Sequence, residues 1–564
     1  MSHNAMAGAA TSLQIAATAL DRAMQPWLRT NGSGPVAMRN VYPISVIHSK
    51  IWTAITIALN SGRQKQETMA STRTLHFIAT FSLLIFAAAV VGSVCSDPSI
   101  SSNIDILKVS SPSYGKEQDN YWSAGCGALK PSCILYPSTP EQMAEVVKVL
   151  ASNNETFAIK SGGHNPNQGF ASVSGGPLIS TNKLNEVTFE KSSMTVRVGP
   201  GNRWEDVQKV LDNQGVVVVG GRIGNVGVGG LVLGGGMSFL SPQYGWAVNN
   251  VVEFEVVLAN GTIVTASTSS HPNLYKALKA GGNNYGIVTA YTLVAHPQGQ
   301  IWGGTVVFTA DKADTLLAAL RDFTEENPDE KASILMTAEL TAFGAVDVWI
   351  VFLFYDGPTP PPGTFDAFIK TGPLINNCKK RSYYDYLSSN NFAVVKPAFY
   401  SLATEMTPVP NKTEAAEVLG TYHRHWRDSF EGVRHVPGLF ATIAFIPVTK
   451  GLARKARSRG GDMIDLDDSV DRIMLEFAFS HWLPWDAPTM DAAMQRLYDG
   501  MRDLVMMHTD NGRLPQAYLP LYMNGAYFRQ DYFGRLRTVD FAKRVRDVYD
   551  PEGLFAERTG GWKM

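Results

Sequence analysis

In its first half, the chain alternates between amphipathic stretches and short apolar runs. Residues 143–150 place apolar side chains at helical spacing behind Pro, Ser and Thr start signals, and residues 204–214 form a second amphipathic stretch. The apolar runs 157–159 and 216–219 follow these stretches and predict buried strands. Helices and strands that alternate in this way predict an α/β arrangement for this part of the chain.

The pattern changes after about residue 300. Strand-like runs at 305–308, 346–354 and 473–479 are separated by helical stretches such as 312–326. This alternation of strand-like runs and helical stretches predicts an antiparallel sheet that is backed by helices.

One turn is also predicted in detail. Asn260-Gly261 lies between the strand-like runs 254–258 and 262–265, which indicates a β-hairpin with a type I′ turn.

The N-terminal region contains a candidate targeting segment. A basic lead at Arg73, an apolar run at 77–91 and small residues before a polar stretch predict a signal peptide or signal anchor over 69–94. Residues 1–68 are interpreted as a non-native extension from an incorrect gene model, or alternatively as an organelle-targeting leader. Entry into the secretory pathway predicts a secreted protein. It would also make three triplets glycosylation acceptors, at Asn154, Asn260 and Asn411.

Composition narrows the classes of partner. A chain of 564 residues is too long for one ordinary core, so two or more domains are expected. A formal net charge of −1 argues against nucleic acid as a partner. No stable membrane partner is expected unless the signal segment remains uncleaved. The four cysteines lack zinc-ligand spacing, and no metal site is predicted.

Three glycine-rich turns carry the candidate chemistry. The first is Ser161-Gly162-Gly163-His164, the second spans 224–236 and the third spans 281–288. Glycine lets the backbone approach a ligand closely, and its N–H groups can form an anion-binding concavity. The second segment has neither the GxGxxG spacing of a nicotinamide site nor a nucleotide P-loop. The turns therefore predict close backbone contact with a large flat or phosphorylated ligand.

In this order, these segments resemble the flavin-binding domain of the vanillyl-alcohol oxidase superfamily. The resemblance is to the berberine-bridge-enzyme-like branch of fungal FAD-linked oxidases, and it covers about residues 120–564. Besides the first turn, it rests on 228–246, 249–252, 281–288, 522–524 and 549–555.

The resemblance implies an α+β fold. A PCMH-type FAD-binding domain of two α/β subdomains is joined to a substrate domain with an antiparallel sheet backed by helices. The implied parts are an N-terminal connector (95–127), the FAD-binding domain (128–299), the substrate domain (300–510) and a C-terminal segment that completes the FAD-binding domain (511–564).

The resemblance also implies how FAD is held. His164 aligns with the histidine that bonds covalently to the flavin ring. Ile223 stands where many relatives have a second, cysteinyl attachment, so a single bond is expected. The other implied cofactor-binding residues are Ser161, Gly162, Gly163, Gly169, Val228, Gly229, Gly230, Gly235, Gly236, Gly286, Ile287, Val288 and Asn524.

Two residues are candidates for catalysis. Strand alternation puts Glu476 on one face with Ala478 and Ser480, and relatives suggest that this carboxylate is the base. The alternative is a strand glutamate in a salt bridge or at the surface. Tyr522 would orient the substrate, or else is a core aromatic. Relatives commonly have an acidic residue soon after Asn524, but here the chain continues as 525–527, Gly-Ala-Tyr.

The implied activity is that of an oxidase. A small organic substrate, such as a secondary-metabolite intermediate, would give a hydride to FAD, and dioxygen would be reduced to hydrogen peroxide. The alternatives are a carbohydrate oxidase and a secreted flavin-fold binding protein with little catalysis. The sequence does not identify the substrate.

Overall fold

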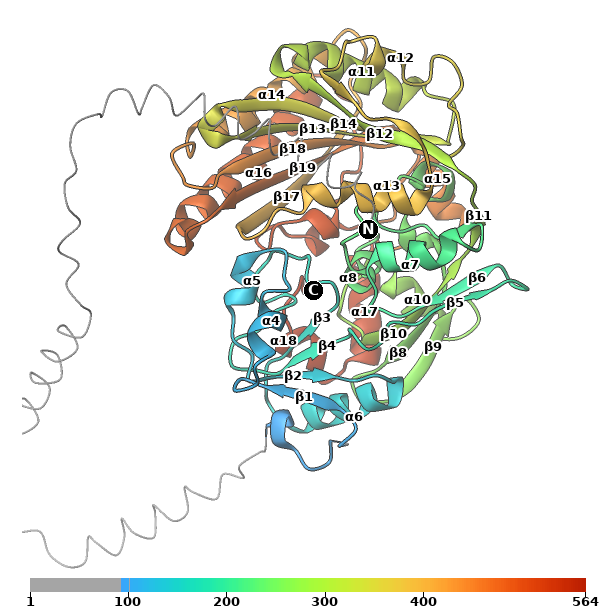
Figure 1. Ribbon diagram of the computed structural model, residues 1–564, viewed down its shortest axis with the longest axis vertical. Helices are drawn as coiled ribbons and strands as arrows, with labels where there is room; N and C mark the ends of the chain where they lie inside the picture. Colours follow the sequence, from blue (N-terminus) through green and yellow to red (C-terminus); the bar gives the residue numbers. More distant parts are fainter. Residues whose placement is uncertain (1–92, 101) are drawn as a thin grey trace, which may run out of the picture. The chain divides into compact units, whose positions relative to one another are not determined.

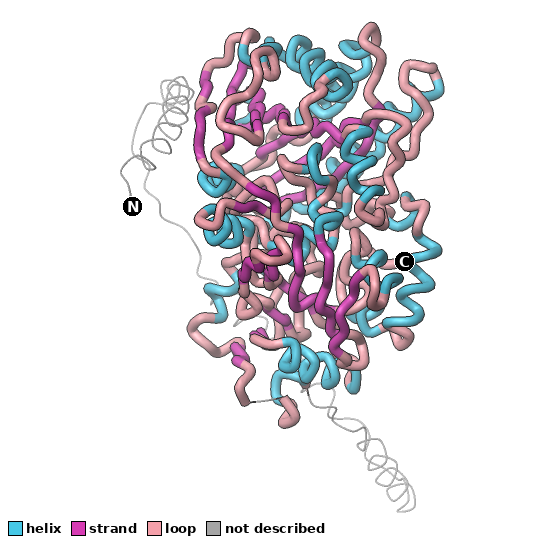
Figure 2. The backbone as a smooth tube through the Cα atoms, turned by 90° about the vertical axis from the view of Figure 1, so that its right-hand side faces the viewer, coloured by secondary structure: helices cyan, strands magenta, loops and turns pink. Residues whose placement is uncertain are grey.

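The computed structural model describes residues 93–100 and 102–564 (Figure 1). The extension 1–68 and nearly all of the predicted signal segment 69–94 lie outside the described residues. Within the described ranges, no helix is long and apolar enough to cross a membrane. Figure 2 shows a large sheet in the upper part of the molecule and smaller sheets in the lower part.

A mixed four-stranded sheet begins the lower part. Its order is β1 (Asp105–Lys108), β2 (Cys133–Tyr136), β4 (Leu178–Ser180), β3 (Ala158–Lys160). The β1–β2 pair is antiparallel, whereas β2, β4 and β3 are parallel. Helix α6 (Pro140–Ser152), capped by the Thr139 side chain, buries its apolar face in the same core. The predicted helix and the strand after it are thus confirmed.

The predicted N-terminal connector, 95–127, belongs to this sheet. It supplies β1 and the helices α4 (Tyr114–Gln118) and α5 (Ala124–Ala128). A disulfide joins Cys95 to Cys133 on β2. Pairing with β2 and the disulfide thus tie this segment to the sheet.

The second sheet is antiparallel, in the order β5 (Val187–Glu190), β6 (Thr195–Val198), β10 (Ile287–Val294), β8 (Val251–Val257), β9 (Ile263–Ser267). Helices α7 (Trp204–Asp212) and α10 (Pro272–Leu278) share its core. The predicted strand at 216–219 is shortened to β7 (Val216–Val217), which pairs with β11 (His296–Pro297).

The predicted hairpin is present as β8–β9, but the type I′ turn is wrong. That turn needs positive φ at both central residues. In the hairpin loop only Gly261 has a positive φ, +75°. Its N–H donates to the carbonyl of Leu258, and the Asn260 side chain accepts from the N–H of Thr262. The asparagine therefore stabilises the loop through its side chain while its own φ stays negative.

The large sheet is wholly antiparallel, as the strand pattern predicts. Its order is β15 (Ile375–Asn376), β12 (Ile301–Thr309), β14 (Val346–Tyr355), β13 (Ala332–Thr341), β18 (Phe440–Val448), β19 (Arg472–His481), β17 (Phe399–Pro408), and β16 (Lys379–Arg381) also pairs with β12.

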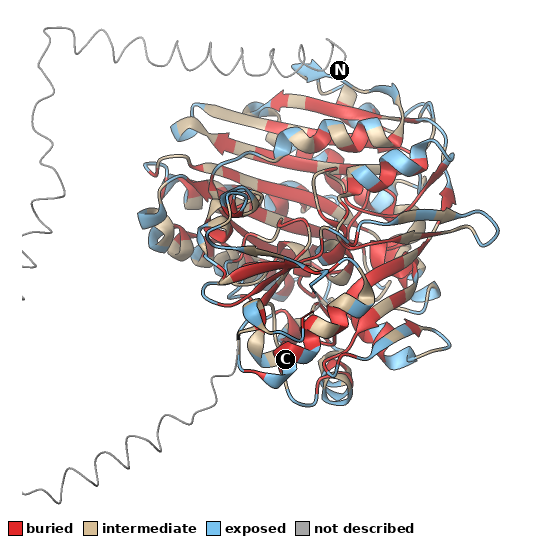
Figure 3. Ribbon diagram, turned by 60° about the horizontal axis from the view of Figure 1, so that its bottom comes forward, coloured by how far each residue is buried: buried red, intermediate tan, exposed pale blue. Residues whose placement is uncertain are grey.

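Three long helices cover one face of the large sheet, and its other face is turned toward the lower part of the molecule. The covering helices are α11 (Ala313–Glu326), α14 (Ala415–Glu431) and α16 (Ala487–Asp510) (Figure 1). Met336, Ile443 and Phe477 point to this covered face and are fully buried. Figure 3 shows the strands largely buried and the helices exposed on their outer sides. On the opposite face, helix α13 (Tyr383–Ser389) packs against β12 and β14, and β17 and β19 approach Trp122 and Arg222.

The C-terminal segment returns to the lower part. Helix α17 (Val539–Tyr549) contacts α10, and Phe555 of α18 (Leu554–Arg558) packs edge-on against Phe157. Arg558 donates to the carbonyls at the C-terminal end of α6. These contacts attach the C-terminal segment to the lower part.

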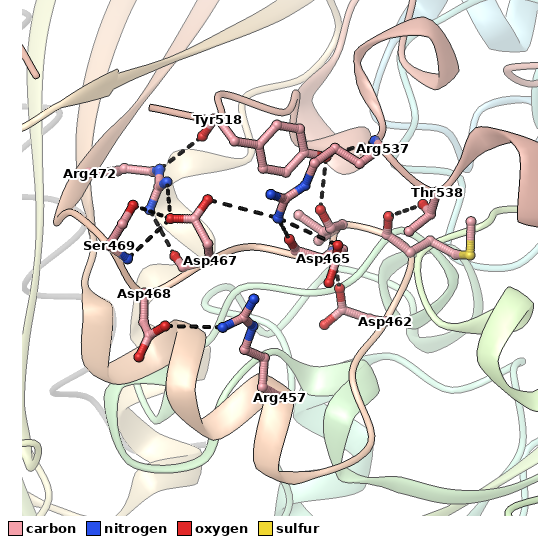
Figure 4. A network of polar contacts seen from close by, with 12 residues as sticks. Arg457, Asp462, Asp465, Asp467, Asp468, Ser469, Arg472, Tyr518, Arg537 and Thr538 are labelled. Atoms are coloured by element: carbon pink, nitrogen blue, oxygen red, sulfur yellow. Dashed lines mark hydrogen bonds and ion pairs between the residues drawn. The ribbon is translucent and has the colours of Figure 1, made fainter. Parts of the chain in front are cut away.

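A polar network joins the start of β19 to this returning segment (Figure 4). The fully buried Arg472 pairs with Asp467 at 3.0 Å and donates to the carbonyl of Tyr518 at 3.0 Å. Arg537 stacks over the Tyr518 ring at 4.0 Å and pairs with Asp465 at 3.4 Å. The network thereby fixes the chain just before Tyr522 and Asn524.

Asp467 allows a test of this network. Burial acts to raise the pKa of Asp467, but hydrogen bonds from Ser469 and Arg472 outweigh it and lower the pKa from 3.8 to about 2. The stabilisation is complete above the ordinary pKa and is lost as pH falls toward 2. Asp467→Asn should lower the free energy of unfolding by about 2 kcal/mol at neutral pH, measured by urea unfolding, and weaken its acid dependence.

The matched control is Asp468→Asn. Asp468 pairs with Arg457 at the surface, at 3.1 Å, and should contribute less than about 1 kcal/mol. Equal losses in the two variants would show that the buried network has no special role.

Candidate active site

The glycine-rich turns meet around one cavity between the two smaller sheets and the C-terminal segment. Most of the predicted cofactor residues line it, namely Ser161, Gly162, Gly163, His164, Gly229, Gly230, Gly286, Ile287, Val288 and Asn524. The fold therefore brings together residues that are up to 363 positions apart, from Ser161 to Asn524.

Four predicted residues do not line this cavity. Val228 is fully buried in the core beneath it, at the start of α8 (Val228–Leu233). Gly235 and Gly236 follow α8 with positive φ, +103° and +76°, and shape the turn. Gly169 lies against the C-terminal end of the chain, because a Cβ at Gly560 would come within 1.8 Å of the carbonyl oxygen of Gly169. These four residues support the walls of the cavity but do not line it.

The tightest contact joins the first two glycine turns. A Cβ at Gly162 would lie 2.5 Å from the Cα and N of Gly227, and one at Gly227 would lie 2.4 Å from the N of Gly162. Real Cβ atoms do not approach a backbone so closely, so both positions require glycine. Ser161 adds a bridge, since its hydroxyl donates to the carbonyl of Pro200 at 2.5 Å and accepts from the N–H of Gly229 at 3.2 Å.

His164 is held by the second turn. Its Nε2 lies 2.8 Å from Oδ1 of Asn225. Arg203 also donates to Asn225 Oδ1, at 3.2 Å, which fixes that atom as an acceptor. The Nε2 of His164 must therefore carry the hydrogen, and in the neutral ring Nδ1 holds the lone pair.

The ring is neutral at ordinary pH. Burial, helped by the nearby charges of Arg203 and Lys396, lowers the pKa of His164 to about 4 against the opposing effect of the hydrogen bond with Asn225. Within the described ranges no group hydrogen-bonds to Nδ1. The ring stacks on Trp122 at 5.7 Å, and Trp122 stacks on Tyr400 of β17 at 4.3 Å. A neutral, oriented imidazole thus borders the cavity, and Trp122 links it to the large sheet.

Asn524 and Tyr522 enter from the C-terminal segment. Asn524 donates from Nδ2 to the carbonyl of Leu231 at 2.8 Å and to the Tyr522 hydroxyl at 3.2 Å. That hydroxyl also accepts from the N–H of Met237 at 2.8 Å, and burial raises the pKa of Tyr522. Gly234 leaves room for the amide, because a Cβ there would lie 2.0 Å from Asn524 Oδ1.

Tyr522 is packed as a residue of the hydrophobic core. It is 4 % exposed, stacks on Trp246 at 5.8 Å and does not line the cavity, although Met523 and Asn524 do. Its catalytic role stays a prediction.

Glu476 lies where the large sheet approaches the second turn. Its carboxylate is 3.9 Å from Nη2 of Arg222 and keeps a side-chain exposure of 25 %. A Cβ at Gly525 would lie 2.9 Å from Glu476 Oε2. Any side chain at 525 would crowd this carboxylate, which gives a physical reason for glycine soon after Asn524. Ile223, next to Arg222, is half-buried and does not line the cavity.

The sequence did not single out several residues of the site. Asn225 has no recognisable spacing signal; its role follows from the fold of the second turn against His164. At the C-terminal end of the chain, Gly560, Gly561 and Trp562 line the cavity. Asn283 donates to the carbonyl of Gly560 at 3.0 Å, which holds this end in place. In the sequence, the glycine pair Gly560-Gly561 was the one feature that could have indicated a role for this end in the cavity.

Comparison with known proteins identifies the class. Residues 131–267 match the family described as "FAD binding domain". An uncharacterized FAD-linked oxidoreductase of Arthroderma benhamiae is 40% identical over 474 residues, or 82% of this chain and 93% of that protein. The chain belongs to this family of FAD-linked oxidoreductases.

Further similarities extend the assignment. A FAD-dependent monooxygenase of Cochliobolus heterostrophus is 33% identical, covering 79% of this chain and 87% of that one. The solved structure of berberine bridge enzyme from Eschscholzia californica superposes with a TM-score of 0.64 at 17% identity, covering 82% of this chain and 97% of the other. The FAD-linked oxidoreductase thus has the fold of the berberine-bridge-enzyme-like branch.

The cavity suits FAD. Its glycine-lined walls offer close backbone contact to a flat ring and a pyrophosphate, and His164 and Asn524 supply polar groups at its edge. No group of three or more His, Cys, Asp or Glu side chains placed to hold a metal occurs in the part of the chain that the structure describes.

The Gly162–Gly227 contact can be tested directly. Gly162→Ala must push the two turns apart and should lower the free energy of unfolding by about 1–3 kcal/mol. Gly230→Ala is the matched control, since a Cβ there meets no atom within 4 Å. Its free energy of unfolding should stay within about 1 kcal/mol of the wild type. Similar losses in denaturant unfolding of both variants would contradict the close-contact argument.

Proposed function

We propose that this FAD-linked oxidoreductase is an oxidase with FAD bonded covalently to His164 alone. The single observation that carries the attachment is the orientation of His164, whose Nε2 is committed to Asn225 while Nδ1 has no hydrogen-bond partner among the described residues. A neutral imidazole nitrogen with a free lone pair, at the edge of the cavity, is a suitable nucleophile toward the ring. Isoleucine at 223 offers no thiol for a second bond.

Bound FAD would accept a hydride from a small organic substrate and pass its electrons to dioxygen, which gives hydrogen peroxide. The protein must remove a proton from the substrate O–H or N–H. Glu476 is the proposed base, because its carboxylate keeps accessible surface beside the second turn, and its contact with Arg222 at 3.9 Å is loose. Tyr522 and Asn524 hold each other and the turn after α8 in place. A secondary-metabolite intermediate is the proposed substrate class.

A secretory location is part of the proposal. The disulfide Cys95–Cys133 suits an oxidising compartment. The three candidate glycosylation sites, Asn154, Asn260 and Asn411, are all exposed.

Covalent attachment predicts a simple result. Acid-precipitated, washed wild-type protein from a eukaryotic host should stay yellow, whereas His164→Ala should release all its flavin to the supernatant, as measured by absorbance. His271→Ala is the control, because His271 lies at the surface and contacts Tyr549. A colourless wild-type pellet would reject the bond to His164.

The proposed base predicts a second result. Glu476→Gln should keep its flavin and lower kcat by about 10²–10⁴-fold, measured as peroxide release over a panel of alcohols, amines and oligosaccharides. Glu431→Gln on the outer helix α14, paired with Arg434, should retain full activity.

The same assay separates the alternatives. Turnover of oligosaccharides alone would favour a carbohydrate oxidase, and incorporation of labelled oxygen from dioxygen into product would favour a monooxygenase. No turnover of any compound by flavin-loaded protein would favour a binding protein.

A further inference from the structure

A second carboxyl group lies on the same sheet face as Glu476. Glu339 of β13 pairs in register with Thr442 of β18, which pairs with Ala478 of β19. Paired residues of an antiparallel sheet project to the same face, and Ala478 shares a face with Glu476 two residues away. Glu339 and Glu476 therefore both project away from the covering helices.

This face borders the FAD-binding part on three strands. Two contacts are direct, Tyr400 of β17 on Trp122 and Glu476 of β19 near Arg222. The third is indirect: Phe352 of β14 packs on Phe392 of the segment Asn390–Ala393, whose Asn391 accepts from the N–H of Asn225. Strand β13 lies between β14 and β18, so contacts with the FAD-binding part occur on both sides of it. Glu339 consequently lies on the sheet face that is turned toward the FAD-binding part.

Glu339 has no partner of its own. No hydrogen bond or ion pair joins it to any other residue within 93–100 and 102–564, and its paired neighbours across the strands are Val348 and Thr442. The Arg222 guanidinium lies beside Glu476 instead. Glu339 is half-buried, and burial raises its pKa to about 7. The carboxyl group therefore keeps some accessible surface but is poorly solvated.

Small side chains separate the two carboxyl groups. Thr442, Ala444 and Ala478 occupy the sheet face between them. Strands β13 and β19 are separated by one strand, and Glu476 lies two residues along β19 from the position opposite Glu339, so the two Cα atoms are about 12 Å apart. That distance leaves room for one ring system of a substrate.

We propose that Glu339 is a specificity residue that binds a protonated nitrogen of the substrate while Glu476 faces the group that is oxidised. This deepens the proposed function and rests on it. A lone carboxylate that is largely desolvated is costly, and a substrate ammonium group compensates its charge. A neutral substrate of the same shape leaves the carboxylate unpaired. The enzyme therefore selects basic nitrogen compounds over neutral analogues.

The test uses a matched pair of probes on the flavin-loaded enzyme. Tyramine carries an ammonium group where tyrosol carries a neutral hydroxyl. Titration at about pH 8, where both Glu339 and tyramine are charged, is followed by the change in flavin absorbance, which requires no turnover. Tyramine should bind wild-type enzyme at least about tenfold more tightly than tyrosol, and Glu339→Gln should abolish this difference by weakening tyramine alone.

Two controls make the result decisive. Glu431→Gln, on the covered side of the same sheet, should keep the wild-type preference, and thermal unfolding checks that Glu339→Gln is folded. Equal affinities in wild-type enzyme, absence of tyramine binding, or a preference that persists in Glu339→Gln would each overturn the proposal. Because binding is measured without catalysis, failure of the oxidase reaction is a separate outcome.

Discussion

The backbone contact between Gly162 and Gly227 is the constraint on which the site depends. The two turns come from different parts of the FAD-binding region and touch where any side chain would separate them. Their approach places Asn225 against His164 and Gly229 against Ser161. The orientation of the imidazole, on which the proposed bond to FAD rests, follows from this contact.

The large sheet contributes in a different way. Its two faces have opposite demands, since one buries apolar side chains under helices and the other carries the carboxyl groups of Glu339 and Glu476. Alternation along each strand meets both demands at once. In β19, Phe477 faces the helices while Glu476 faces the second turn. In β13, Met336 and Glu339 divide in the same way.

The C-terminal segment joins the two parts. It leaves the large sheet through the network of Arg472 and Asp467, passes Tyr522 and Asn524, and ends against the cavity at Trp562. Positions distant in sequence are therefore rigidly placed beside the first turn. Acidic residues near 462–468 serve this connection and are largely matched by arginines.

The sequence by itself determined the elements and the family. Helical periodicity predicted α6, α7 and α11, strand alternation predicted the large antiparallel sheet, and the order of three glycine turns indicated a flavin site, because these signals are local and each is carried by neighbouring residues. Only the tertiary structure decided which side chains meet. Contacts between distant strands and turns place Asn225 at His164 and Gly525 beside Glu476. They also order the segment 95–127 and leave Glu339 unpaired among the described residues. Such contacts arise from packing, and no local pattern encodes them.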